Sequence, residues 1–409
     1  MLVQFAVENF QSIKNRVVLD MRKMNISEHK DSLIEEEYLP ASVIYGPNGG
    51  GKSTVLRALG TVFSIITNPV RVVTNKGMVN SNPAIHIKPF LLDNESKNNP
   101  TIFELVFKIK DNQYRLTLEY FNDVIVYECL EEKGPKGKPA KLYERVENSI
   151  EIGDKLKHLQ IKQLPIAGNM PVISVLKVVY DVSPIKDIFD WAMFCVAIDY
   201  SQPRVEEYIK GAITLSEKDE TLKNLTRKML KYLSIGIDDY ELEYFDETKS
   251  RFTVKTIHKV NDAMFELKLG DESMGTQKVF NMLPFIITSL QTGAMIVVDE
   301  LDAKLHPKML ARIIGLYTNK DNNPKGAQLI FTSHDLSTMK SDVFRRDEIW
   351  FAAKDKEEST ELYSLADIKG LDGDMVRIDA AYSKQYLVGR YGADPYFSSM
   401  AKWEDASGD

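Results

Sequence analysis

The stretch GPNGGGKST, from Gly46 to Thr54, places a lysine and a hydroxyl residue directly after a run of glycines. Glycines let a backbone curve around an anion so that successive amide groups point inward. Lys52 supplies a full positive charge for outer phosphates, and Ser53 offers a hydroxyl group to Mg²⁺. These residue types at this spacing predict a site for a nucleoside triphosphate and its metal ion.

The residues on either side of this stretch predict the elements that hold it in place. Ala41 to Tyr45 is apolar and partly β-branched, as a buried strand should be. Val55 to Ile66 carries apolar side chains at helical spacing, and the dipole of such a helix adds positive potential where an anion binds. A glycine-rich turn that binds nothing is the alternative, and the flanking strand and helix argue against it.

Two later strands end in side chains that suit phosphate chemistry. The apolar strand in MIVVDE ends at Asp299, which can hold Mg²⁺ through water, and at Glu300, which can act as a general base. The strand in FTSHD ends at His334, which can donate to a γ-phosphate or sense its loss. The carboxyl ends of parallel strands converge on one crevice, which would bring these side chains together. Ordinary strand ends at the surface are the alternative.

The segment SMGTQ, from Ser273 to Gln277, predicts a second anion site made of a hydroxyl group, backbone amides and a helix start. Taken alone, a helix N-cap is the simpler interpretation. A head-to-tail pair of subunits would explain two phosphate cradles in one chain, because the second cradle could close on the γ-phosphate held by the partner's loop. Such an isologous dimer would bury two ATP molecules at a two-fold interface.

Periodic patterns along the rest of the chain predict how these motifs are carried. A β-hairpin precedes the glycine loop, with VENFQSIKN interpreted as a simple turn. Alternation of apolar and polar residues predicts an antiparallel block with strands at Thr101–Lys110, Tyr114–Tyr120, Val124–Glu131 and Lys141–Val146. Helical stretches around Trp191 are expected within 173–200, and one or two amphipathic helices over 203–234. Strands are expected at Tyr240–Phe245, Arg251–His258 and Met264–Leu269.

Together the patterns predict an α/β fold whose core is a mixed sheet flanked by helices. An antiparallel β subdomain and an inserted helical subdomain are expected to be attached to this core. We expect residues 1–70 to form the N-terminal part of the core and 71–170 a β-rich subdomain. Residues 171–262 are expected to form a helical insertion with small strands, and 263–409 the C-terminal part of the core.

Composition narrows the function classes. The chain has 409 residues and a net charge of -7, so it has no global basic field for nucleic acid. Its modest basic clusters, Arg345-Arg346 and the lysines between 133 and 141, are interpreted as solvated loops. No apolar run approaches the roughly 20 residues that span a bilayer, and two distant cysteines suit a reducing compartment. We therefore expect a cytoplasmic protein without a membrane partner.

The order of motifs resembles the ABC-type ATPase family, in the branch that includes Rad50, SMC, RecF and overcoming-lysogenization-defect (OLD) proteins. Three segments are most similar to the prokaryotic AAA family ATPases of phage-defence and abortive-infection operons. They are VENFQSIKN, DELDAKLHP and the ending RRDEIWF…ELYSL…YLVGRYGADPYF. The resemblance covers about 170 residues at both ends of the chain. It implies an ABC-type P-loop ATPase core.

The resemblance also implies a role for each matching residue. Asp302 would lie in the loop that couples two sites, His334 would be the switch histidine and Glu300 the catalytic base. Asp299 and Ser53 would serve Mg²⁺, while Ser273 and Gly275 would reach across a dimer. The residues expected to wrap the phosphates are Asn48, Gly49, Gly50, Gly51, Lys52, Ser53 and Thr54.

Two departures from the family pattern are visible. The signature reads ESMGTQ, whereas transporter-type members carry LSGGQ. The glutamine that links the insertion to the nucleotide has several candidates, which are Gln113, Gln160, Gln163 and Gln202.

The function that the resemblance implies is an ATPase that dimerises around two ATP molecules and controls a partner effector in antiviral defence. The assembly would be a homodimer or a higher even-numbered oligomer, and the effector a protein such as a nuclease encoded in the same operon. The alternative is a RecF- or SMC-like ATPase that binds DNA during repair or maintenance, although a nucleic-acid surface is not evident. A transporter subunit is a third interpretation, against which DELDAKLHP and the ending argue.

Overall fold

The computed structural model describes residues 1–67, 87–159, 161, 166–201, 205–247, 251–369 and 375–393. Of the candidate glutamines, Gln160, Gln163 and Gln202 lie outside these ranges, whereas Gln113 lies in a strand of an antiparallel sheet. The end of the YLVGRYGADPYF segment, from residue 394 onward, also lies outside them. Within the described ranges, every helix is too short or too polar to traverse a bilayer.

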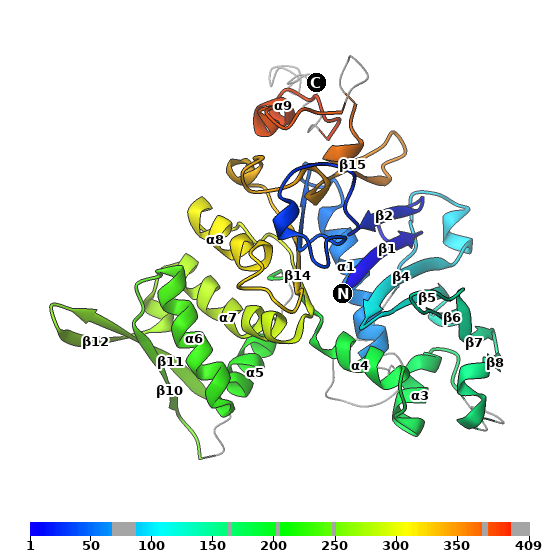
Figure 1. Cartoon of the computed structure of the whole chain (residues 1–409), viewed down its shortest axis with the longest axis horizontal. Coiled ribbons are helices and arrows are strands. Elements are labelled where there is room, and N and C mark those ends of the chain that lie inside the picture. The colour runs from blue at the N-terminus through cyan, green and yellow to red at the C-terminus, as the bar shows by residue number, and fades with distance from the viewer. Residues whose placement is uncertain are drawn as a thin grey trace, which may run out of the picture.

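A six-stranded sheet occupies the centre of the molecule (Figure 1). Its order is β16-β15-β3-β14-β13-β9, and all neighbouring strands run parallel except β16, which is antiparallel to β15. The bounds are β3 Ala41–Tyr45, β9 Val196–Ile198, β13 Met295–Val298, β14 Gln328–Thr332, β15 Ile349–Lys354 and β16 Thr360–Ser364.

Helices cover both faces of this sheet. Neighbouring residues of a strand point to opposite faces, so Ile44 and Val43 of β3 enter two different hydrophobic cores. The core that contains Ile44 includes α1, Lys52–Thr67. The core that contains Val43 includes α7, Met274–Thr292, and α8, Pro307–Thr318. Burial on both faces explains why these strands are continuous apolar runs in the sequence.

An antiparallel sheet with the order β2-β1-β4-β5-β6-β7-β8 packs beside the central sheet, on the right in Figure 1. The N-terminal hairpin belongs to this sheet, because β1 pairs with both β2 and β4. The predicted strands of the antiparallel block are confirmed, and β8 is an addition to them. The bounds are β1 Leu2–Glu8, β2 Val17–Asp20, β4 Thr101–Ile109, β5 Asn112–Phe121, β6 Val124–Lys133, β7 Ala140–Val146 and β8 Ser149–Ile152.

A helical part lies on the opposite side of the central sheet, on the left in Figure 1. Helix α6 begins where the carboxylate of Asp219 accepts hydrogen bonds from the amides of Thr221 and Leu222. A small sheet of the order β10-β11-β12 joins these helices, and β12 projects furthest from the core. The bounds are α5 Val205–Lys218, α6 Glu220–Leu233, β10 Asp239–Tyr244, β11 Phe252–Val260 and β12 Ala263–Lys268. The predicted fold class is confirmed.

The prediction of helical stretches around Trp191 within residues 173–200 is confirmed, and the segment ends in a strand that was not predicted. Helices α3, Val172–Tyr180, and α4, Ile185–Phe194, are followed by strand β9. Three residues are too few to show a strand period, and β9 exists because it pairs with β13 at the end of the central sheet. Because β9 runs parallel to β13, it ends at the same carboxyl edge of the central sheet. A short helix, α9 Tyr382–Leu387, lies near the described C-terminal end.

The interpretation of Arg345 and Arg346 as a solvated loop is also wrong. Arg345 is fully buried and its Nη2 lies 2.7 Å from Oδ2 of Asp347. Arg346 lies 2.6 Å from Oε1 of Glu28, with 12% of its side chain exposed. Buried cations need partners. Asp347, which is near in sequence, and Glu28, which is more than 300 residues away, neutralise the two arginines, and the local charge pattern did not reveal this pairing.

Candidate active site

The loop between β3 and α1 is wedged against the last two strands of the central sheet. A Cβ atom on Gly46 would lie 2.1 Å from the carbonyl oxygen of Ala352 in β15. Gly51 has a φ of +100°, and a Cβ atom there would lie 2.0 Å from Oγ1 of Thr360. Only glycine fits both positions, so the phosphate loop (Gly46–Thr54) has its path set by β15 and β16.

Lys52 begins α1 and folds back over the phosphate loop. Its Nζ donates hydrogen bonds to the carbonyl oxygens of Gly46 at 2.9 Å and Pro47 at 3.0 Å. Lys52 is 6% exposed, and burial lowers the pKa of its ammonium group, against the opposing effect of Asp299 and other nearby acids. The charge is therefore held beside the loop and close to the acidic strand end.

Thr332, the last residue of β14, organises the acidic end of β13. Its hydroxyl group donates to Oδ1 of Asp299 at 2.6 Å and accepts a hydrogen bond from the amide of Glu300 at 2.7 Å. Asp299 is 9% exposed, whereas Glu300 is exposed. Glu300 has a φ of +51°, which places the chain in a sharp turn directly after the strand. One hydroxyl group thus holds the carboxylate of Asp299 and the backbone of Glu300.

Asp302 links this turn to the end of β14. Its Oδ2 accepts hydrogen bonds from the amides of His334 at 3.0 Å and Asp335 at 2.9 Å. Its Oδ1 is buried and has no hydrogen-bond partner among the described residues. The imidazole of His334 is exposed. The acidic turn (Asp299–Lys304) is therefore tied to β14 at two points, Thr332 and the amides that follow it.

The order of the strands brings the predicted residues to one edge. Strand β14 lies between β3 and β13, and all three run in the same direction. The phosphate loop, the acidic turn and His334 each follow the carboxyl end of one of these strands. The arrangement expected from parallel pairing is therefore present, with Lys52, Ser53, Asp299 and Glu300 at the same edge.

The signature segment (Ser273–Gln277) lies at the start of α7 and is separate from the phosphate loop. Ser273 is the N-cap, and its hydroxyl oxygen accepts a hydrogen bond from the amide of Thr276 at 3.2 Å. A Cβ atom on Gly275 would lie 2.7 Å from the carbonyl oxygen of Lys304, so the segment packs on the acidic turn. Among the described residues, no hydrogen bond joins Ser273 to the phosphate loop of the same chain.

A family model described as "AAA domain, putative AbiEii toxin, Type IV TA system" matches residues 41–159 and 212–340, more than half of the chain. The matched residues include the phosphate loop, the signature segment, the acidic turn and His334. The chain belongs to this AAA family. The predicted resemblance to the AAA family ATPases is thereby confirmed.

Solved structures similar to this AAA domain include two SMC heads. The SMC head domain from Thermotoga maritima is 12% identical with a TM-score of 0.41, covering 89% of this chain and 98% of that one. An SmcHead bound to the C-winged helix domain of ScpA is 10% identical with a TM-score of 0.41, covering 89% of this chain and 97% of that one. A comparison with curated protein sequences found no match.

The AAA domain uses a residue of its N-terminal turn that the sequence interpretation missed. The hydroxyl group of Ser12 donates to Oγ1 of Thr54 at 3.0 Å and lies 2.8 Å from Oγ1 of Thr360. VENFQSIKN is therefore more than a simple turn, because it contacts the phosphate loop. A pocket of about 490 Å³ adjoins it, lined by Gln11, Ser12, Lys88, Pro89, Phe90, Leu91, Leu92, Lys354 and Glu358.

A second missed contact lies at the end of β9 in the same AAA domain. Asp199 follows β9, and its Oδ2 accepts a hydrogen bond from Nε of Arg57 in α1 at 3.1 Å. The amide of Asp299 donates to the carbonyl oxygen of Ile198 at 2.9 Å, so β9 abuts the acidic turn. The only sequence signal was an acid after a short apolar run, which is common on protein surfaces.

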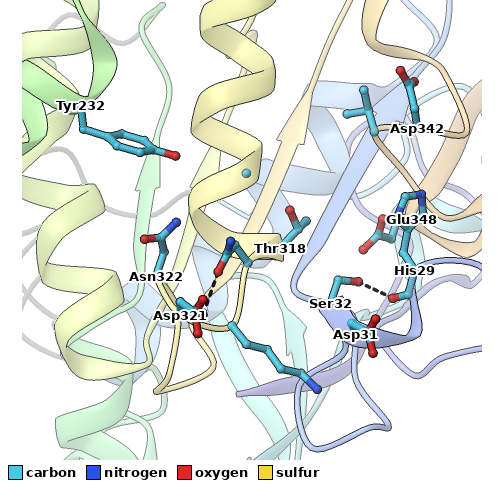
Figure 2. A pocket seen from close by; sticks show the side chains of 13 residues that line it. His29, Asp31, Ser32, Tyr232, Thr318, Asp321, Asn322, Asp342 and Glu348 are labelled. Atoms are coloured by element: carbon cyan, nitrogen blue, oxygen red, sulfur yellow. Dashed lines mark hydrogen bonds between the residues drawn. The ribbon is translucent and has the colours of Figure 1, made fainter.

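Another hollow, of about 610 Å³, lies away from the phosphate loop of the AAA domain. In Figure 2, His29 lies on one side of it and Tyr232 on the other. Glu348 lines it and is buried; burial raises the pKa of this carboxyl group to about 8. Oε2 of Glu348 accepts a hydrogen bond from the amide of Arg345, and Oε1 has no partner among the described residues. None of the predicted site residues lines this hollow.

Proposed function

We propose that this AAA domain binds ATP with Mg²⁺ and hydrolyses it in sites that two copies of the chain share. The observation that carries the proposal is the meeting of Lys52, Asp299, Glu300 and His334 at one edge of the central sheet. A buried cation, a carboxylate that can serve a metal ion, an exposed carboxylate and an imidazole are groups that can stabilise phosphate charge and activate a water molecule for phosphoanhydride hydrolysis.

The phosphate loop fits a triphosphate chemically. A Cβ atom on Gly49 would meet no heavy atom within 4 Å, so the loop tip is open to a ligand. The amides at the start of α1 and the charge of Lys52 would bind the phosphate oxygens. The residues proposed to wrap the phosphates are Asn48, Gly49, Gly50, Gly51, Lys52, Ser53 and Thr54.

Ser53 and Asp299 are the residues proposed to serve Mg²⁺. Both offer oxygen atoms, the ligand type that this ion prefers, and Thr332 already orients the Asp299 carboxylate. When bound, the ion would neutralise charge on the phosphate oxygens. The protein's contribution is to hold the two oxygen ligands at the mouth of the phosphate loop.

Glu300 is the proposed general base. Its carboxylate is exposed at the same edge, while its backbone is fixed by Thr332, so the side chain can take a proton from an attacking water. The oxygen of that water then bonds to the γ-phosphorus, and the bond to the β-phosphate oxygen breaks. His334 would hydrogen-bond the γ-phosphate and report its loss through its amide contact with Asp302.

The pocket beside Ser12 is a suitable place for the nucleoside. Ser12 lines the pocket and contacts Thr54, which follows Ser53, the proposed metal ligand. Leu91 and Leu92 line the pocket and are exposed, so they offer apolar surface that a purine base can cover. We therefore assign the N-terminal turn a role in nucleotide binding in addition to its place in the antiparallel sheet.

The signature segment supports the proposal that the chain dimerises. Ser273 and Met274 are exposed, and in its own chain the Ser273 hydroxyl caps α7. A hydroxyl group and free amides at an exposed helix start suit the γ-phosphate on a partner. We propose a homodimer, or a higher even-numbered oligomer, in which Ser273 and Gly275 of one copy complete the site of the other.

The biological role that we propose is control of a partner effector, such as a nuclease, in antiviral defence. The family description names a toxin–antitoxin system, which supports a regulatory setting. The burial of Arg345 and Arg346 removes one of the two basic clusters on which DNA binding would rest. Cys129 and Cys195 are buried free thiols, which support a cytoplasmic location.

The test uses the Glu300→Gln variant, which should bind ATP without hydrolysing it. Light scattering should show ATP-dependent doubling of the mass, and affinity purification from the native host should retain an effector protein. Lys52→Met serves as the control and should remain a single chain with ATP. A single-chain mass for Glu300→Gln at saturating ATP contradicts the shared site, and salt-sensitive DNA binding without a protein partner contradicts the effector role.

A further inference from the structure

Lys278 lies one turn into α7 and is buried, with 8% exposure. Its Nζ donates hydrogen bonds to the carbonyl oxygen of Glu300 at 2.7 Å and to that of Ala303 at 3.0 Å. The ammonium group also lies 4.9 Å from the centre of the Tyr200 ring. Within the described ranges, no carboxylate forms an ion pair with it. A buried lysine whose hydrogen bonds go to two backbone carbonyl groups is costly, which points to a purpose other than packing.

The two acceptors lie within a single turn that holds a strained residue. Glu300 has a φ of +51°, a backbone conformation that residues other than glycine rarely adopt. The amide of Ala303 donates back to the carbonyl oxygen of Glu300 at 3.1 Å, so the turn closes on itself. Lys278 binds this turn from the side of α7, while Thr332 binds it from β14. Strain of this kind persists only when surrounding contacts over-determine the backbone.

The start of α7 touches the same turn at a second point. Gly275 packs so closely on Lys304 that a Cβ atom would lie 2.7 Å from its carbonyl oxygen. Three residues further along α7, Lys278 reaches the carbonyl groups of Glu300 and Ala303. The signature segment and the acidic turn are therefore connected by a close backbone contact and two hydrogen bonds.

We propose that Lys278 is a positioning residue, which couples engagement of the signature segment to the backbone position of Glu300. The inference rests on the proposed function, in which the start of α7 meets the γ-phosphate bound by a second copy. Closure onto that phosphate would press α7 towards the acidic turn, and Lys278 would fix the carbonyl group of the base. Glu300 remains the catalytic residue, because Lys278 contacts only its backbone.

A purely structural role makes a different prediction. If Lys278 served only packing, Lys278→Met would leave the response to ATP unchanged and would remove an expensive buried charge. Burial lowers the pKa of Lys278 to about 8, which agrees with that cost. Under our proposal Lys278→Met folds, binds ATP and loses the coupling, whereas Lys278→Arg, which keeps donors for both carbonyl groups, restores part of it.

The experiment measures hydrogen exchange and hydrolysis on the full chain with ATP and Mg²⁺. In the wild-type protein ATP should protect the phosphate loop and the peptide that covers Asp299–Lys304. In Lys278→Met the phosphate loop should remain protected, while protection of the acidic turn is lost and kcat falls about tenfold at nearly constant KM. Lys228→Met, which removes an exposed lysine from the neighbouring α6, is the matched control and should behave as wild type.

The outcomes separate the two proposals. If ATP protects both segments equally in Lys278→Met and in the wild type, the coupling role of Lys278 is overturned while ATP binding stands. If Lys278→Met loses protection of the phosphate loop as well, the residue is structural and the proposal is also overturned. Absence of ATP protection in the wild-type phosphate loop overturns the proposed function itself, and the coupling role with it.

Discussion

Oγ1 of Thr332 donates a hydrogen bond to Oδ1 of Asp299 at 2.6 Å and accepts one from the amide of Glu300 at 2.7 Å. One side chain at the end of β14 therefore orients the carboxylate of a proposed metal ligand and holds the backbone of a proposed general base. Its contact crosses from one strand of the central sheet to the next, so the site depends on the registry of β13 and β14.

Thr332→Val tests this contact with almost no change in shape. The variant leaves Oδ1 of Asp299 and the amide of Glu300 without their partner, which should lower the free energy of unfolding by about 1–3 kcal/mol. ATP hydrolysis should fall more strongly than ATP affinity. Urea unfolding and steady-state kinetics measure the two effects. Thr221→Val, at the exposed start of α6, should change neither, and equal activity of both variants would contradict the assignment.

Lys52→Met should abolish tight ATP binding without unfolding the protein. The methionine side chain retains the packing, but the phosphate oxygens lose the ammonium charge, so affinity should fall by at least about tenfold. Because Lys52 is desolvated, the unfolding free energy should stay within about 1 kcal/mol of the wild type. Titration calorimetry and urea unfolding give both numbers. If the ATP affinity of Lys52→Met equalled that of the wild type, the proposal that the phosphate loop binds ATP would be contradicted.

Mixing two inactive variants tests whether a site is shared. Lys52→Met destroys the phosphate loop, and Ser273→Arg blocks the signature segment. A mixed dimer contains one intact site, formed by Lys52 of one copy and Ser273 of the other. An equimolar mixture should therefore regain up to about a quarter of wild-type hydrolysis, since about half of the dimers are mixed. If each site lay within one chain, the mixture would stay as inactive as its components.

Glu348 predicts a specific dependence of stability on pH. Burial raises its pKa from 4.5 to about 8, with Asp347 and Glu28 acting in the same direction and Arg345 opposing them. Between these values the folded chain retains a proton that the unfolded chain releases. The contribution to stability is therefore complete below pH 4.5 and is lost as the pH rises through about 8.

Glu348→Gln should remove this dependence, because the amide cannot ionise. In the wild type the loss amounts to at most about 1.4 kcal/mol per pH unit across the window. Denaturant unfolding at a series of pH values measures it. Glu361→Gln, an exposed change in β16, should keep the wild-type slope. Parallel slopes for Glu348→Gln and the wild type would show that Glu348 titrates normally.

Most of the fold follows from local patterns. The continuous apolar runs of β3, β13 and β14 and the helical spacing of α1 were sufficient to predict the central sheet and one of its layers. Strand β9 was missed because three residues carry no period and its partner, β13, lies about 100 residues later. The pairing of β1 with β4 is likewise a long-range choice that alternation alone does not specify.

The site shows the same division between motif and context. Lys52, Asp299 and His334 follow from residue type and from their place at strand ends. Ser12 and Thr332 are ordinary hydroxyl residues in the sequence. Their use is visible only in the fold, where the N-terminal turn contacts the phosphate loop and the end of β14 contacts the acidic turn. The sequence around Arg345 is typical of a charged surface loop. Its burial beside Asp347 is set by tertiary packing, which the local sequence does not specify.

The strand order of the central sheet also constrains how the chain can fold during synthesis. Strand β3 is synthesised early. Its two neighbours, β14 and β15, are synthesised only after the first 327 residues of the chain. Until then β3 has none of its partner strands, whereas every strand of the antiparallel sheet from β1 to β8 has already been synthesised. Truncated translation products should therefore lack any competent nucleotide site, and the emerging chain must keep an apolar strand unpaired for most of its synthesis.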